Sequence, residues 1–125
     1  MQDLIIEPTR KTPEIVFKTN GELHLSGISL PQNVIDFFMP VFSWLEQLKS
    51  MGLQKISFTI DLVYLDTSST KAILSMLKLL KRIVPAEEGL EVIWKYEQGD
   101  MDMLDQGEVL QRTTKIPFRF EEIEA

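Results

Sequence analysis

The stretch Lys55–Lys71, KISFTIDLVYLDTSSTK, changes from a strand pattern to a helical pattern at its centre. Apolar side chains fill every second position of its first part and are expected on one face of a strand: Ile56, Phe58, Ile60, Leu62 and Tyr64. Four hydroxyl residues, 67–70, follow directly, and the apolar spacing after them is helical until Pro85. A strand that leads straight into a helix predicts an α/β fold.

A hairpin is predicted near the beginning of the chain. The strand-like runs 15–18 and 22–26 flank Asn20-Gly21, the dipeptide that most favours a tight turn between two strands. Residues 1–13 contain two prolines and are expected to form an irregular arm. The hairpin therefore places the first strands of the sheet early in the chain.

Helices and strands alternate after the hairpin. A helix is expected from Pro31 to about Met51, with a kink or break at Pro40. Strands are expected at 90–96 and 116–120, with an acidic helix between them. This order predicts a single domain over residues 1–125, in which about three helices cover one sheet of about five strands.

The first helix carries more apolar residues than one core-facing stripe requires: Phe37, Phe38, Phe42, Trp44, Leu45 and Leu48. One interpretation is that the helix is largely buried within its own domain. The alternative is that part of this belt stays exposed as a surface for a partner or a second copy.

Composition and charge exclude several classes of function. The chain has a net charge of −6, no cysteine and one histidine, and 44% of its residues are hydrophobic. This acidic balance argues against a nucleic-acid partner, and no apolar run is long enough for a membrane span. Without a secretion-type leader or any cysteine, a cytoplasmic protein is expected.

Catalytic and metal-binding patterns are not recognisable, and no cofactor is predicted. The single histidine, His24, falls in the middle of a predicted strand and has no nucleophile motif beside it. An acidic cluster does not have the spacing of a calcium-binding loop and is better explained by helix-start electrostatics: Asp100, Asp102, Asp105 and Glu108. The chain is therefore predicted not to be an enzyme and to hold no metal.

The helix after the hydroxyl cluster carries basic residues on the side opposite its apolar stripe: Lys71, Lys78, Lys81 and Arg82. In an acidic protein this stripe has two interpretations. It is either a solvated helix face or a surface that docks onto an acidic partner.

The hydroxyl cluster also has two interpretations. Thr67 or Ser68 could serve as the helix cap, which contributes about 1 kcal/mol. Alternatively, one hydroxyl is phosphorylated, which would add about −1.5 to −2 charges among the free N–H groups of the helix start. Local chemistry alone favours the cap.

The residues resemble a known family along nearly the whole chain. Asp66-Thr67-Ser68-Ser69 is similar to the phosphorylation motif of STAS-type anti-sigma-factor antagonists, although the glycine of that motif is missing. Tyr64–Ala72 is closer to the SiaC family of biofilm-regulatory phosphoproteins, whose motif has asparagine where this chain has Asp66. Further stretches carry the same resemblance: Thr12-Pro13, Gly27–Asn33, Phe37-Phe38, Trp44, Asp102–Leu104, Gly107-Glu108 and Pro117–Phe120.

The resemblance implies a STAS-like fold and a regulatory role. Thr67 is the implied phosphorylation site, with Asp66, Ser68 and Ser69 as its recognition context. The basic stripe, independently of the resemblance, makes Lys71 and Lys78 the candidate partner-binding residues. The implied partners are a dedicated Ser/Thr kinase, a PP2C-type phosphatase and a diguanylate cyclase that the unphosphorylated form stimulates. Two alternatives stay open, namely an anti-sigma-factor antagonist and a small-ligand-binding or structural module that uses the apolar helix.

Overall fold

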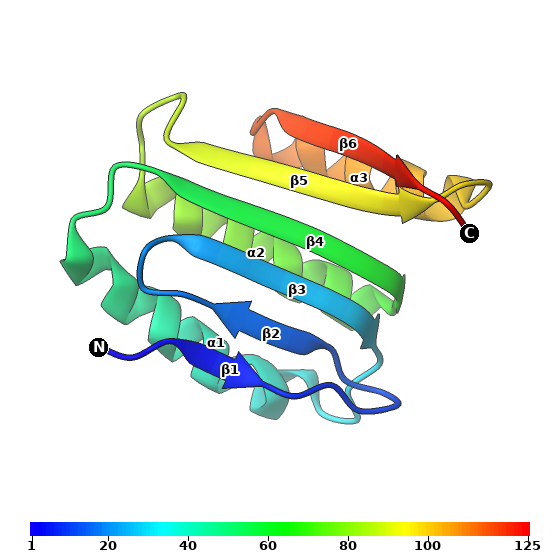
Figure 1. Cartoon of the computed structure of the whole chain (residues 1–125), viewed down its shortest axis with the longest axis horizontal. Helices are drawn as coiled ribbons and strands as arrows, with labels where there is room; N and C mark the ends of the chain where they lie inside the picture. The colour runs from blue at the N-terminus through cyan, green and yellow to red at the C-terminus, as the bar shows by residue number, and fades with distance from the viewer.

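The computed structural model describes all residues, 1–125, as one six-stranded sheet covered on one face by three helices (Figure 1). The strands are β1 (Leu4–Ile6), β2 (Glu14–Phe17), β3 (Glu22–Ser29), β4 (Ile56–Leu65), β5 (Leu90–Glu97) and β6 (Phe118–Ile123). The helices are α1 (Val34–Leu48), followed by the short 3₁₀ helix η1 (Lys49–Met51), α2 (Thr67–Ile83) and α3 (Met101–Thr114). The predicted α/β class and the three helices are confirmed.

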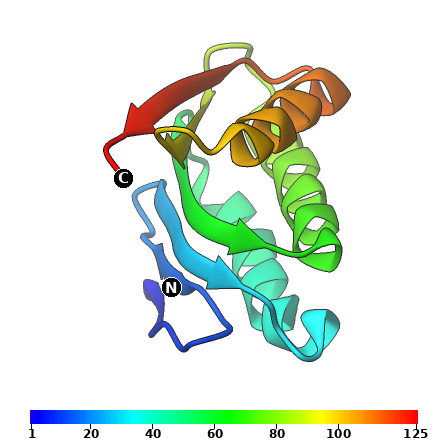
Figure 2. The ribbon, with the colours of Figure 1, turned by 90° about the vertical axis from the view of Figure 1, so that its right-hand side faces the viewer.

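The strands lie in the sheet in their sequence order. Strands β1 to β3 pair antiparallel, and β3 to β6 pair parallel. Each helix connects two neighbouring parallel strands, and all three connections return on the same side of the sheet (Figure 2). The other face of the sheet has no helix over it. Along β3, exposed polar side chains on this open face, such as Glu22 and His24, alternate with buried apolar ones on the helix side.

The predicted strand count of about five is wrong because the arm is only partly irregular. Leu4–Ile6 forms β1, which pairs with β2 through the partners Ile5 and Val16. The Trp44 indole N–H donates a hydrogen bond of 2.8 Å to the Gln2 carbonyl and so holds the arm against α1. A strand of three residues is too short to give a readable alternation, and its position depends on this contact with α1.

Pro40 does not break the first helix. Asn33 caps α1 by accepting a 3.1 Å hydrogen bond from the Asp36 N–H, so Pro31 precedes the helix rather than lying in its first turn. The helix then continues through Pro40, whose exposed side chain lies on the solvent side. The backbone bond that proline removes is therefore lost where water can substitute for it.

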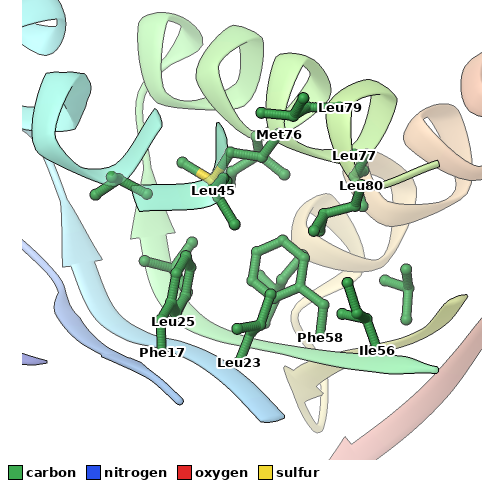
Figure 3. Packing of buried hydrophobic residues seen from close by; sticks show 14 of the residues in the cluster. Phe17, Leu23, Leu25, Leu45, Ile56, Phe58, Met76, Leu77, Leu79 and Leu80 are labelled. Atoms are coloured by element: carbon green, nitrogen blue, oxygen red, sulfur yellow. The ribbon is translucent and has the colours of Figure 1, made fainter. Parts of the chain in front are cut away.

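The core lies between the sheet and the helices (Figure 3). Phe17 from β2 packs against Phe58 from β4 with ring centroids 5.7 Å apart, and Leu45 and Met76 close over them from α1 and α2. Four residues of the apolar belt of α1 are buried in this core, and the other two, Phe37 and Phe42, are partly buried and pack against it. The belt is therefore used mainly within its own domain, and the exposed apolar residue Ile35, 70% exposed, lies outside it.

A bulge changes the phase of β4 near its end. Gly27 pairs with Leu62 and Ile28 pairs with Tyr64, so Val63 has no partner in β3. The extra residue turns Tyr64 outward, where it is 54% exposed, and leaves Leu65 buried. The prediction that Tyr64 shares a face with the alternating apolar residues of this strand is wrong for this reason, and Tyr64 lies instead at the surface near the hydroxyl cluster.

Gly107 allows α3 to approach the sheet. A Cβ at this position would lie 2.6 Å from Cδ1 and Nε1 of Trp94, whose indole N–H donates a 3.0 Å hydrogen bond to the Met103 carbonyl. Trp94 is fully buried and cannot move aside cheaply.

We therefore expect Gly107→Ala to destabilise the protein by about 1–3 kcal/mol, because overpacking against the indole outweighs the better helix propensity of alanine. Urea unfolding followed by tryptophan fluorescence measures the change. Asp105→Ala, at an exposed position of the same helix, is the matched control and should change stability by less than about 0.5 kcal/mol. Equal stability of the Gly107→Ala variant and the wild type would contradict the packing argument.

Candidate functional site

The cap of α2 is Asp66, not Thr67 or Ser68. One carboxylate oxygen of Asp66, Oδ1, accepts a 2.8 Å hydrogen bond from the Ser69 N–H and a 2.9 Å bond from the Ser68 hydroxyl. This arrangement satisfies one of the free backbone donors at the helix start. The expectation that a hydroxyl of Thr67 or Ser68 caps the helix is corrected, because the carboxylate one residue earlier takes that role.

Ser69 joins the start of α2 to the end of β3. Its hydroxyl is fully buried, lies 2.7 Å from the Ser29 hydroxyl and donates to the Ser29 carbonyl at 3.1 Å. The same carbonyl accepts a 3.1 Å bond from the Asp66 N–H. Ser69 is therefore a structural residue, and its hydroxyl is inaccessible to an enzyme.

Thr67 differs from the other three hydroxyl residues of the cluster. Ser68 and Ser69 are bonded as described, and the Thr70 hydroxyl lies 3.2 Å from both the Asp66 carbonyl and Oε1 of Gln106. The Thr67 side chain is exposed at the first residue of α2, and its hydroxyl makes no hydrogen bond within the protein. The geometry therefore leaves Thr67 as the hydroxyl most open to modification.

The carboxylate of Asp66 is held in its charged form. Partial burial by itself raises its pKa, but the hydrogen bonds from Ser69 and Ser68 outweigh this effect, so the pKa of Asp66 lies below its ordinary value of 3.8. The cap is thus anionic at neutral pH. A further negative group on Thr67 would be added next to an existing charge.

Thr67 lines an acidic cleft at the edge of the parallel strands. The register between β4 and β5 ends at Ile60 and Trp94, and beyond these residues a cleft of about 510 Å³ lies between the end of β4 and the start of α3. Its walls include the exposed Tyr64 ring and three carboxyl side chains, from Asp66, Asp100 and Asp102.

An open groove of about 520 Å³ lies on the other side of the α2 start, between α1 and α2. Its apolar wall comes from α1 and includes Ile35 and Met39, which are 70% and 57% exposed. Its polar rim includes Ser68 and Lys71 from α2 and Glu46 from α1. Ile35 and Met39 were not among the residues predicted from sequence to form a site, although with Phe42 they form a second apolar stripe at helical spacing beside the core-facing one.

The basic residues of α2 divide into two groups. The Lys81 ammonium donates a 2.9 Å hydrogen bond to the Thr114 carbonyl at the end of α3. Lys71, Lys78 and Arg82 are exposed, and none takes part in either of the two ion pairs of the structure, Lys18–Glu22 and Arg119–Glu121. Three cations on this face of α2 are therefore available to a partner.

The remaining residues considered in the sequence form no catalytic or metal site. Asp100 caps α3 by accepting a 3.1 Å bond from the Met103 N–H, and His24 is exposed on the open face of the sheet. No three His, Asp or Glu side chains converge closely enough to hold a metal ion. None of the helices has the length and apolar character that crossing a bilayer requires.

The fold and the site define an α/β domain with one free hydroxyl at a helix start, between an acidic cleft and an apolar groove. The family model described as SiaC family regulatory phosphoprotein matches residues 6–123. The chain belongs to this family, and the resemblance drawn from the sequence is confirmed. An uncharacterized protein of Pseudomonas aeruginosa (strain UCBPP-PA14) is 29% identical over 119 residues, which cover 94% of each chain.

Solved structures support the same assignment. SiaC of Pseudomonas aeruginosa is 28% identical, with a TM-score of 0.86 over 98% of this chain and all of that one. A structure of the diguanylate cyclase SiaD in complex with its activator SiaC, from the same organism, contains a chain that is 28% identical. This match has a TM-score of 0.88 and covers 97% of our chain and 100% of that chain.

The different surroundings of Thr67 and Ser69 predict that two similar substitutions change the free energy of unfolding by very different amounts. We expect Ser69→Ala to lower the free energy of unfolding by about 1–3 kcal/mol, because it removes a hydrogen-bond partner of the buried Ser29 hydroxyl. Thr67→Ala should change stability by less than about 0.5 kcal/mol, since an exposed and unbonded hydroxyl is lost. Thermal and urea unfolding of the two variants decide the point, and equal losses would show that Thr67 is also structural.

Proposed function

We propose that this chain is a non-enzymatic cytoplasmic regulator whose partner binding is controlled by phosphorylation of Thr67. A dedicated Ser/Thr kinase transfers the terminal phosphoryl group of ATP to the Thr67 hydroxyl oxygen and releases ADP and the hydroxyl proton. A PP2C-type phosphatase hydrolyses the ester to threonine and inorganic phosphate. The unphosphorylated form binds and stimulates a diguanylate cyclase.

The observation that carries this proposal is the isolation of Thr67 from the hydrogen bonds of its neighbours. A residue that alternates between two chemical states without unfolding its domain has to be accessible and has to contribute little to stability. Thr67 meets both conditions, whereas Ser69 meets neither. Membership of a family of regulatory phosphoproteins supports the same residue, because the family resemblance includes the sequence around it.

The cyclase partner is supported by the solved relative. SiaC, to which this chain is similar over almost its whole length, is the activator of the cyclase SiaD in the complex of those two proteins. In our chain, the groove between α1 and α2 exposes apolar residues and has Lys71 and Glu46 on its rim, and the exposed Lys78 lies further along α2. These features suit a protein partner with apolar and charged residues, a carboxylate facing Lys71 among them.

The alternatives from the sequence have weaker support. A STAS-like fold is what the family resemblance implies, whereas an anti-sigma-factor antagonist role rests on the short motif at Asp66–Ser69 alone. A small-ligand module would use the groove on α1, but this groove is open, because its residues Ile35 and Met39 are largely exposed to solvent. Small-molecule sites typically bury 70% or more of the surface of their ligand, and an open groove does not favour such burial.

Thr67 variants test the proposal directly. We expect Thr67→Ala to accept no phosphate from the cognate kinase and to keep cyclase binding. Thr67→Glu should weaken binding by about tenfold or more, since a negative charge is introduced beside the groove, one helical turn before Lys71. Radiolabelled ATP and isothermal titration calorimetry give the two measurements.

Thr113→Ala is the matched control for these variants, because it removes an exposed threonine hydroxyl of α3 that lines neither the cleft nor the groove. It should still be phosphorylated. Phosphate incorporated into Thr67→Ala at the wild-type level would refute the assignment of Thr67.

Charge reversal tests the basic face of α2. The double variant Lys71→Glu/Lys78→Glu should bind the cyclase more weakly and associate about tenfold more slowly at low salt, because electrostatic attraction speeds encounter. Stopped-flow fluorescence at two salt concentrations measures the rate. The control Lys49→Glu/Lys55→Glu has the same change in net charge at exposed lysines outside α2, and an equal slowing there would exclude a specific role for this face.

A further inference from the structure

Thr67 does not line the groove between α1 and α2. Thr67 lines the acidic cleft, whereas Ser68 and Lys71 line the groove. A phosphate on Thr67 would therefore be attached outside the groove, on the opposite side of the α2 start. Control of the groove by Thr67 requires a residue that can contact both.

Lys71 is placed to make that connection. It lies four residues after Thr67 in the same helix, and side chains at this spacing are neighbours on one face, about 5–6 Å apart at their Cβ atoms. Its ammonium group has no hydrogen-bond or ion-pair partner in the protein. Because Lys71 also lies on the rim of the groove, its ammonium group can contact a partner protein bound in that groove.

The charges of the cleft favour the Lys71 side for a phosphate. A phosphothreonine carries about −1.5 to −2 charges at neutral pH. The cleft beside Thr67 contains carboxyl groups of Asp66, Asp100 and Asp102, and the carboxylate of Asp66 is kept ionised by its hydrogen bonds. Repulsion from these groups on one side and attraction to Lys71 on the other act in the same direction.

We propose that Lys71 carries the phosphorylation signal from Thr67 to the groove. In the unphosphorylated protein, Lys71 is free to bind a carboxylate of the partner at the groove rim. In the phosphorylated protein, Lys71 pairs with the phosphate one helical turn before it and is lost to the partner. The inference rests on the proposed function, since it takes Thr67 to be the phosphorylation site.

The ion pair can be tested without any partner. Full-length protein with phosphothreonine incorporated at position 67 is titrated by ³¹P NMR. A nearby ammonium stabilises the dianion, so Lys71→Met should raise the phosphate pKa by about 0.2–0.4 unit, the shift that corresponds to an i, i+4 ion pair. Lys78→Met removes the same charge two turns further along α2 and should leave the pKa unchanged.

The signalling role is tested by the ratio of the dissociation constants of the phosphorylated and unphosphorylated forms for the cognate cyclase. Lys71→Met should reduce this ratio about twofold, the factor that an ion pair of this strength allows, whereas Lys78→Met should weaken both forms alike and preserve the ratio. A phosphate pKa unaffected by Lys71→Met, or a ratio equal to that of the wild type, overturns the inference. Either result leaves the proposed function intact, which fails instead if the kinase does not modify Thr67.

Discussion

The hydrogen bonds among Ser29, Asp66 and Ser69 fix the start of α2 against the end of β3. One carbonyl, that of Ser29, accepts from both the Asp66 N–H and the buried Ser69 hydroxyl. Because the Asp66 carboxylate also caps the helix, hydrogen bonds hold the chain on both sides of Thr67 and leave Thr67 exposed between them. The exposure of Thr67 is a consequence of this junction.

The junction also explains how one residue can be modified without disturbing the fold. The residues that stabilise the strand-to-helix turn are those on either side of Thr67, and their bonds do not include its hydroxyl. Capping and modification were alternative interpretations of the same hydroxyls in the sequence. In the structure they belong to different residues, since a carboxylate forms the cap and a threonine remains free.

Thr67 lies at the boundary of two surfaces with different chemistry. The cleft on one side is acidic, and the groove on the other is apolar, with Lys71 and Glu46 on its rim. A modifying enzyme and an effector that approach Thr67 from these two sides would meet different side chains. Lys71 lies on the groove side, one helical turn after Thr67, and in our proposal it pairs either with the phosphate or with the partner.

Much of the fold could be predicted from sequence, because it depends on local patterns. The alternation in β4, the Asn20-Gly21 turn and the stop at Pro85 each have a strong short-range cause. The missed features depend on contacts between distant residues: β1 is held by Trp44, and the bulge that exposes Tyr64 is defined only by the pairing with β3. Likewise, the motif indicated the hydroxyl cluster, but only the buried bonds to Ser29 separate Ser69 from Thr67.

The most direct test of the central claim is to localise phosphate on the chain as its native host makes it. The protein is isolated with phosphatase inhibitors, before and after a change of growth condition, and its peptides are sequenced by mass spectrometry. The account predicts a single phosphorylated residue, Thr67, at an occupancy that changes with the condition. Phosphate on Ser69 or Thr70 in the folded protein, or on no residue of the chain under any condition, would contradict it.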